Sequence, residues 1–190
     1  MPESRPSYVM EGTQHEFLYN YSRKKTTEAV NVIIEIPAQH AAIKYEVDKE
    51  QDCLMVDRFL STPMFYPANY GYIPETLAED GDPLDALVIC PTPVAPGAVV
   101  YSRPIGIFHM QDENGPDDKV ICVPHSSLTP RYDGIEEVSQ LPGTLRDQVE
   151  HFFSHYKDLE PGKWVTTAGW GTQAEAIELI KSSLTAYSSH

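Results

Sequence analysis

The chain has 190 residues, of which 41% are hydrophobic, so it is long enough for one well-buried core and short for two. Its 28 acidic residues against 14 basic ones give a formal charge of -14, which argues against a protein that mainly binds the nucleic acid backbone. We therefore expect a single domain that binds no nucleic acid.

The cysteines and the apolar runs indicate a cellular location. Cys53, Cys90 and Cys122 are odd in number, widely spaced and set in apolar sequence, which favours neither a disulfide framework nor a zinc motif. No apolar run approaches the roughly 20 residues of a membrane span. The beginning of the chain lacks the continuous hydrophobic segment of a signal peptide. These features predict a cytoplasmic protein that does not associate with a membrane.

Residues 1–28 are polar and lack a clear period, and we expect them to form a partly ordered arm before a single domain over 29–190. A β-rich run over 31–36 then predicts the first strand. Glu35 is a charge within this strand. Alternation can place its side chain in solvent, or the strand can direct it into an acidic cavity, and the pattern leaves both open.

Alternating runs predict two further strands over 43–47 and 54–59. Lys44, Glu46 and Arg58 are the charged residues of these runs, and taken alone they are most simply interpreted as the solvent side of a sheet.

Residues 64–72 are rich in aromatic and small side chains, which is typical of a loop packed over a core. Tyr66 and Tyr70 in this segment carry hydroxyl groups that could instead donate hydrogen bonds to a phosphate.

An acidic turn follows, reading Asp-Gly-Asp-Pro-Leu-Asp from Asp80 to Asp85. Gly81 and Pro83 exclude an ordinary helix or a central strand, so a turn holds the three carboxylates. Two bare carboxylates about 4 Å apart repel by about 4 kcal/mol at an effective dielectric near 20. We therefore expect a cation among them, and a hard divalent ion such as Mg²⁺ or Mn²⁺ suits a set of oxygen ligands.

A second acidic turn runs from Asp112 to Asp118 and again combines carboxylates with Gly and Pro, and Lys119 follows directly. A single turn of this kind is most often a solvated surface feature. Two of them, each leading into an apolar run, favour a shared function.

The apolar runs after each turn predict strands over 86–90, 99–109 and 120–123, the second bent near Pro104 and Gly106. Short strands separated by Pro and Gly turns indicate a small barrel or sandwich.

Helices are expected only late in the chain. Apolar residues at helical spacing predict one helix over 144–157, with Thr144 as a candidate N-cap. Thr172 and Glu175 form a capping box that begins a second helix. His151 and His155 lack the intervening glutamate of a metalloprotease motif and are interpreted as structural or interfacial.

Carboxylate-held metals beside convergent cations are what the transfer of a phosphoryl group to water requires. A barrel that joined the two acidic turns at a mouth also lined by Lys44, Arg58, Lys119 and Lys157 would supply both. The chain has no Walker-type loop and no nucleophile elbow. From the residues alone, the prediction is metal-dependent hydrolysis of a phosphate compound.

The acidic turn, preceded by Phe65-Tyr66-Pro67 and Asn69-Tyr70-Gly71-Tyr72, closely resembles the soluble family I inorganic pyrophosphatases, especially the bacterial type. Further matching motifs run in order over about residues 29–180: Glu35-Ile36-Pro37, Lys44-Tyr45-Glu46, Val56-Asp57-Arg58, Asp112-Glu113 with Asp117 and Lys119, and His155-Tyr156-Lys157-Asp158-Leu159. The resemblance implies a mainly β fold with α elements, a five-stranded OB-like β-barrel flanked by two main helices. It also implies hydrolysis of inorganic diphosphate with several Mg²⁺ ions, for which Mn²⁺ could substitute.

The resemblance further implies a role for each matched residue. Asp82 would accept a proton from the attacking water. Metal ligation would fall to Asp80, Asp85, Asp112 and Asp117, with Glu35 acting through water. Phosphate would be bound by Lys44, Arg58, Lys119, Tyr156 and Lys157, with support from Tyr66 and Tyr70. Glu46 and Glu113 match other acidic positions of the cavity.

The implied partner is diphosphate bound as its metal complex, and bacterial relatives imply a homo-oligomer, typically a hexamer. Two other hypotheses remain at this point. One is a different metal-dependent phosphohydrolase with room for an organic group, and the other is a non-catalytic OB-type binding module. The acidic charge argues against the second, because OB barrels that bind oligonucleotides usually have a positive groove.

Overall fold

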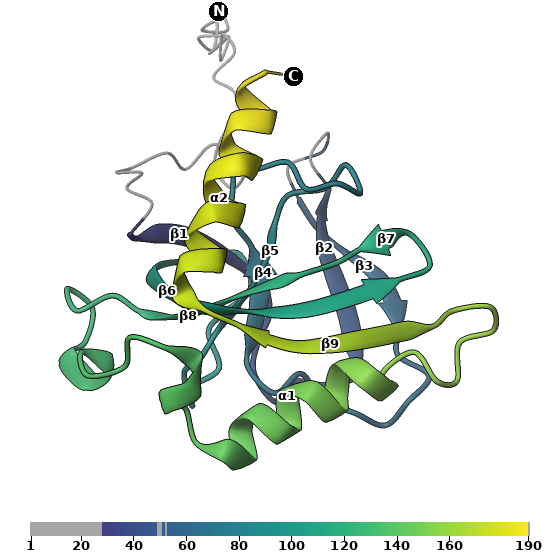
Figure 1. Cartoon of the computed structure of the whole chain (residues 1–190). Coiled ribbons are helices and arrows are strands. Elements are labelled where there is room, and N and C mark those ends of the chain that lie inside the picture. Colours follow the sequence, from purple (N-terminus) through teal and green to yellow (C-terminus); the bar gives the residue numbers. More distant parts are fainter. Residues whose placement is uncertain (1–27, 49–50, 52, 190) are drawn as a thin grey trace, which may run out of the picture.

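The structure, a computed structural model, describes residues 28–48, 51 and 53–189 (Figure 1). The arm predicted for residues 1–28 lies outside these residues except for Glu28. No helix of the described residues is long and apolar enough to cross a membrane.

Five strands close into a barrel. They are β1 (Val30–Ile36), β4 (Asn69–Tyr72), β5 (Asp85–Val88), β8 (Lys119–Pro124) and β6 (Val99–Asp112). They pair in that order, and β1 also pairs with β6, which closes the ring. The β5–β8 pair is parallel, whereas the other pairs of the ring are antiparallel. The predicted five-stranded OB-like barrel is therefore confirmed.

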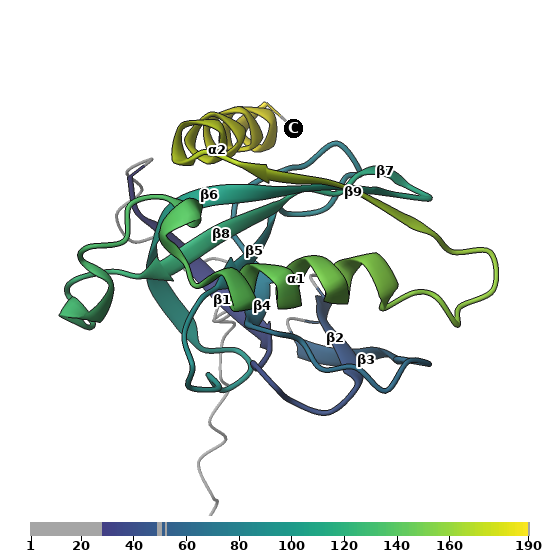
Figure 2. The same ribbon diagram turned by 60° about the horizontal axis from the view of Figure 1, so that its bottom comes forward.

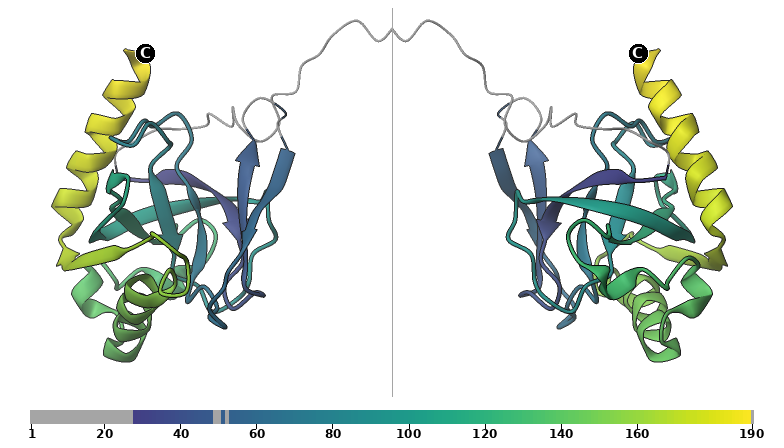
Figure 3. Two further views of the ribbon diagram at one scale, coloured as in Figure 1. Left: turned by 90° about the vertical axis from the view of Figure 1, so that its right-hand side faces the viewer. Right: turned by 90° about the vertical axis from the view of Figure 1, so that its left-hand side faces the viewer.

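Four further strands extend this frame. The hairpin of β2 (Ile43–Asp48) and β3 (Cys53–Phe59) forms a separate two-stranded sheet, on the side of the barrel away from α2 (Figure 3). β7 (Gly115–Pro116) and β9 (Val165–Gly171) pair with β6. β6 carries an irregularity between Pro104 and Gly106, where the sequence predicts a bend.

Both predicted helices are present, as α1 (Gly143–His155) and α2 (Gln173–Ser188). The Thr172–Glu175 capping box is formed. The N-cap prediction at Thr144 is wrong, because α1 begins one residue earlier, Pro142 occupies the cap position, and no side chain caps the helix. Two short 3-10 helices, η1 (Pro130–Tyr132) and η2 (Val138–Gln140), precede α1.

The two helices cover different faces of the sheet (Figure 2). Successive side chains of β5 point to opposite faces of the sheet, so one strand packs against both helices. Leu87 packs in one cluster with Phe152 and Phe153 of α1, while Ala86 packs in a second cluster with Ile180 of α2. All five side chains are buried. The acidic turn before β5 is thus fixed to a strand that both cores hold in place.

Three strands differ from the sequence prediction. Residues 69–72 form the buried strand β4 rather than part of a loop, and neither β7 nor β9 was expected. A Cβ atom at Gly71 would lie 1.8 Å from the Ile33 carbonyl oxygen, so only glycine allows β1 and β4 to approach this closely. In the segment Asn-Tyr-Gly-Tyr the two tyrosines favour a strand, but Asn69 and Gly71 do not, so propensity does not single it out.

Candidate active site

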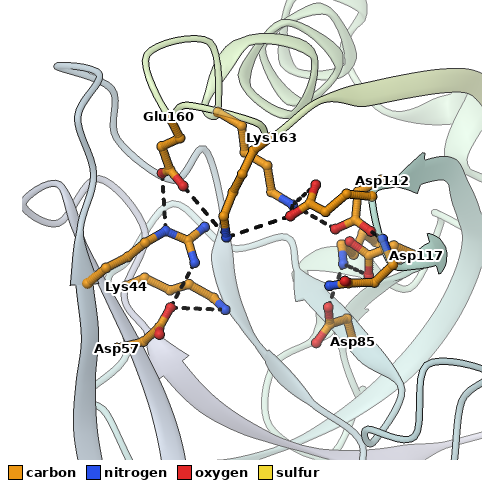
Figure 4. Close-up of polar contacts among 12 residues, drawn as sticks. Lys44, Asp57, Asp85, Asp112, Asp117, Glu160 and Lys163 are labelled. Carbon is orange, nitrogen blue, oxygen red and sulfur yellow. Dashed lines mark hydrogen bonds and ion pairs between the residues drawn. The ribbon is translucent and has the colours of Figure 1, made fainter.

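A cavity of about 320 Å³ opens where the two acidic turns, the β2–β3 hairpin and the segment after α1 meet. Nine carboxylates and five basic side chains are among the residues that line it. All of the residues predicted for the site lie around this cavity: Glu35, Lys44, Glu46, Arg58, Tyr66, Tyr70, Asp80, Asp82, Asp85, Asp112, Glu113, Asp117, Lys119, Tyr156 and Lys157. Figure 4 shows the polar contacts among twelve residues of the site.

Lys119 joins the two acidic turns. Its ammonium group contacts Asp85 of the first turn and Asp117 of the second, and its side chain is only 2% exposed. The Tyr70 hydroxyl also donates to Asp85, at 2.6 Å. The structure therefore confirms that the barrel brings the two turns together.

The ionisation of this cluster reflects its crowding. Burial alone lowers the pKa of the Lys119 ammonium, but Asp85 and Asp117 outweigh it and the pKa is above its ordinary value. Burial raises the pKa of Asp117 to about 6, and the repulsion from Asp85 adds to this, although Lys119 acts in the opposite direction. Burial is thus the main reason why the pKa of the Asp117 carboxyl is raised.

The first acidic turn is shaped by its backbone. Gly81 has a φ of 91°, a left-handed conformation that a side chain would strain. The amide of Asp82 donates to the Asp80 side chain at 3.0 Å. Both carboxylates lie at the exposed rim of the cavity, whereas Asp85 is deeper, at 24% exposure.

Asp112 and Glu113 of the second turn pair with Lys157, which follows α1. The Lys157 ammonium group lies 2.6 Å from Asp112 and 3.2 Å from Glu113, and it is buried. The amide of Asn114 donates to Asp112 at 2.8 Å. Burial acts to raise the pKa of Asp112, but the hydrogen bonds from Lys157 and Asn114 hold it below its ordinary value.

The β2–β3 hairpin contributes the opposite wall. Lys44 and Arg58 are directly paired across the two strands. The Lys44 ammonium contacts Glu46, and Asp57 lies 3.4 Å from Lys44 and 2.8 Å from Arg58. The simplest interpretation of Lys44, Glu46 and Arg58, as residues on the solvent side of a sheet, is therefore wrong. They do share one face, but that face lines the cavity.

Glu35 also lies at the cavity, which resolves the two alternatives left open by its strand. Its side chain is 6% exposed and accepts a hydrogen bond from the Val47 amide at 2.8 Å. Burial raises the pKa of Glu35 to about 8, against the lowering effect of that hydrogen bond.

Three tyrosines form the aromatic floor. Tyr66 packs against Tyr70 and Phe152, with ring centroids 5.1 and 4.6 Å apart, and Tyr156 stacks on Phe152. Burial raises the pKa of all three hydroxyls, so they remain protonated at neutral pH and can donate hydrogen bonds.

Three residues of the polar network were not predicted as site residues. Asp57 bridges Lys44 and Arg58, as described above. Glu160 accepts a hydrogen bond from Arg58 at 3.1 Å, and Lys163 lies 3.8 Å from Glu160 and 3.6 Å from Glu113 (Figure 4). Asp57 adjoins a predicted residue, whereas nothing in the sequence pattern distinguishes Lys163 from a solvated lysine.

The donor set is suited to hard cations, although it is not gathered into a ready metal site. Among the described residues, no group of three or more His, Cys, Asp or Glu side chains is placed to hold a metal ion. The Lys119 ammonium instead occupies the space between Asp85 and Asp117. The nine carboxylates outnumber the five basic side chains, so the cavity can accept further positive charge. The residues therefore fit divalent cations bound through oxygen.

The barrel and its charged cavity have the groups that metal-dependent hydrolysis of a phosphate compound requires. The family model described as inorganic pyrophosphatase matches residues 32–188. Inorganic pyrophosphatase 2 of Pseudomonas syringae pv. tomato is 60% identical over 155 residues, which are 82% of this chain and 86% of that protein.

Solved structures agree with the sequence comparison. The inorganic pyrophosphatase of Helicobacter pylori superposes with a TM-score of 0.86 at 40% identity, covering 89% of this chain and 99% of that one. The inorganic pyrophosphatase of Thermus thermophilus gives a TM-score of 0.85 at 39% identity, covering 90% and 99%. The chain belongs to the inorganic pyrophosphatase family.

Proposed function

We propose that the protein hydrolyses inorganic diphosphate to two orthophosphates with the help of several Mg²⁺ ions. The observation that supports this most directly is the convergence of nine carboxylates and five basic side chains on one cavity. Bound divalent ions would neutralise phosphate oxygens and lower the pKa of the attacking water. Mn²⁺ or a similar ion could take the place of Mg²⁺.

The carboxylates would divide into sets that hold different metal ions. Asp80, Asp85 and Asp117 would hold the tightly bound metal, and Asp85 would also reach a second one. Asp112 and Asp117 would hold a metal that arrives with the substrate. Glu35 would orient another through water. Each of these groups offers only oxygen, which is the donor that Mg²⁺ prefers.

Asp82 would act as the proton acceptor. It lies at the exposed rim of the cavity, within the turn that also carries Asp80 and Asp85. A proton taken from water at this position can pass to solvent. Glu46 and Glu113 add to the acidic field, and each also contacts a basic residue of the cavity.

The basic residues and the tyrosines would bind the substrate. Lys44 and Arg58 converge from paired strands, and Arg58 can bind two phosphate oxygens at once. Lys119, Lys157 and Tyr156 would contact the phosphates from the opposite wall, with Tyr66 and Tyr70 beneath. Because each base is now paired with a carboxylate, substrate binding would exchange that partner for phosphate.

Release of orthophosphate tests this proposal. Protein with Mg²⁺ is incubated with diphosphate, with ATP, with a simple phosphomonoester, or with diphosphate plus EDTA. We expect rapid release from diphosphate alone and its loss with the chelator. Release only from the organic phosphates would favour the second candidate, a different metal-dependent phosphohydrolase, and no release from any of them would favour the non-catalytic binding module.

We also propose a homo-oligomer, a hexamer by family resemblance, in the cytoplasm. Phe59, Phe65 and Leu159 are 71%, 58% and 60% exposed, and apolar side chains of this size are often covered by a partner. His151 and His155 lie on the exposed face of α1, with ring centroids 4.6 Å apart. Light scattering coupled to size exclusion chromatography gives the mass; a monomeric mass would contradict the oligomer.

The three free cysteines support the proposed cytoplasmic location, because the cytoplasm is a reducing compartment.

A further inference from the structure

A second cavity, of about 300 Å³, adjoins the active site across the first acidic turn. Its other walls come from the C-terminal half of α2 and from the turn that precedes β8. Four residues line both cavities: Asp80, Pro83, Asp85 and Asp117. The first acidic turn is therefore a partition between the two spaces.

The partition is attached to the second cavity by its backbone. The amide of Leu77 donates to the Ser183 carbonyl of α2 at 3.0 Å. Within the loop, the amide of Ala78 donates to the Asp82 carbonyl at 2.7 Å. Both Leu77 and Ser183 line the second cavity. A molecule bound there would contact the groups that position the proposed metal ligands and the proposed proton acceptor.

The lining of this cavity indicates the chemistry of its occupant. One part is apolar and includes Leu77, Leu84 and Leu179. Five carboxylates also line it, whereas none of its described lining residues is Lys, Arg or His. Lys119, which lies outside this lining, already pairs with Asp85 and Asp117, so the other three carboxylates carry most of the negative charge of the wall. An apolar surface beside that charge complements a ligand with an apolar body and a positive group. An anionic ligand, including diphosphate itself, would be repelled.

The size of the cavity limits the ligand. An apolar cavity of about 150 Å³ holds one benzene molecule. The space here, about 300 Å³, thus has room for a ring with a short chain that ends in an ammonium group.

We propose that this cavity is a regulatory site for small organic amines with an apolar body. The bound ammonium group neutralises Asp80 from behind the turn and adds positive charge beside Asp85, which already contacts Lys119. Those carboxylates then attract divalent ions less strongly in the active site. By linkage, amine binding and metal binding oppose each other. The coupling part of the proposal rests on the proposed function, whereas the binding part does not.

The probe is 2-phenylethylamine, and its neutral analogue 2-phenylethanol is the matched control. Binding is followed by NMR, through the amide resonances of Leu77 and Ser183. Coupling is followed as the Mg²⁺ concentration for half-maximal diphosphate hydrolysis. We expect saturable shifts of both amides with the amine but not with the alcohol. We also expect the amine to raise the required Mg²⁺ concentration about fivefold.

Two variants of α2 localise the effect. Ala186→Phe places a ring in the cavity, and Ala174→Phe places the same ring on an exposed part of α2 outside it. Ala186→Phe should abolish both responses to the amine, and Ala174→Phe should keep them. Thermal unfolding confirms that each variant is folded before it is compared.

The outcomes separate this proposal from the proposed function. If the protein hydrolyses diphosphate but its Leu77 and Ser183 amide resonances do not respond to the amine, the regulatory site alone is overturned. The same holds if the responses to the amine persist in Ala186→Phe. Amide shifts that appear with the amine but not with the alcohol, and that are lost in Ala186→Phe, would support the binding site. If the protein that shows them did not hydrolyse diphosphate, the proposed function alone would be overturned.

Discussion

Replacing Lys119 with methionine tests how the buried carboxylates are balanced. Lys119 is 2% exposed and contacts both Asp85 and Asp117. Methionine keeps an unbranched side chain of similar length but carries no charge. Removing one partner from a buried charged cluster costs about 3 to 5 kcal/mol, because the remaining charges are left unpaired. In EDTA, Lys119→Met should lose that much unfolding free energy, or about 10 °C in melting temperature.

Magnesium should restore about half of this loss if the same carboxylates bind metal. A ligand at a hundred times its dissociation constant stabilises the native state by about 2.7 kcal/mol. The wild-type protein gains less, because the metal must first displace the Lys119 ammonium. The gap between the two proteins should therefore narrow by about 2 kcal/mol when Mg²⁺ replaces EDTA.

Urea unfolding of both proteins in EDTA and in Mg²⁺ measures these differences without depending on activity. The control is Lys181→Met. The Lys181 side chain is 47% exposed, and its ammonium group pairs with Glu178 at 2.7 Å. That variant should change by no more than about 0.5 kcal/mol in either solution. An equal loss for Lys119→Met in both solutions would refute metal binding by Asp85 and Asp117. Unchanged stability in EDTA would refute the argument from burial.

Three further predictions concern the site and the barrel. Asp82→Asn should keep its Mg²⁺ affinity in calorimetry but lower turnover about a hundredfold. Asp85→Asn should lose Mg²⁺ affinity in the same measurement. An equal loss of Mg²⁺ affinity in both variants would contradict the assigned roles. Gly71→Ala should lower the free energy of urea unfolding by more than about 4 kcal/mol, because the new Cβ atom would lie 1.8 Å from a backbone oxygen. The control Gly134→Ala should fold normally, because its Cβ atom would have nothing within 4 Å. Burial raises the pKa of Glu35 from 4.5 to about 8. Without metal, the stability that its protonated form contributes to the fold is therefore complete below pH 4.5 and is lost as the pH rises to about 8. Glu35→Gln in EDTA should therefore show a smaller fall in stability over that range, and an unchanged fall would mean that Glu35 is not the group responsible.

The barrel was predictable where its strands carry β-branched residues or its helices carry caps. The Thr172–Glu175 box defines the start of α2 because two reciprocal hydrogen bonds form within four residues. Strand β4 was not predictable in this way. Its conformation depends on pairing with β1 and β5, which are distant in sequence, and on the close approach that Gly71 allows.

The sequence predicted which residues gather at the cavity better than it predicted which way their side chains point. Alternation correctly places Lys44 and Glu46 on one strand face. A polar cavity and bulk solvent impose the same alternation, so the residues alone cannot distinguish the two environments. Lys163 shows a different limit. It comes from the segment after α1, and its distances to Glu113 and Glu160 depend on how that segment folds over the barrel.

The contacts in the cavity explain how one set of carboxylates can serve changing cations. Glu35, Asp80 and Asp112 each accept a hydrogen bond from a backbone amide, at 2.8 to 3.0 Å. These bonds remain when a basic side chain moves away. Lys119 and Lys157 are instead held mainly by the carboxylates that they contact. The acids are thus fixed by the barrel and its turns while the bases can exchange partners. Such an arrangement lets metal or phosphate replace an internal ion pair without rebuilding the site, which is the preorganisation that electrostatic catalysis requires.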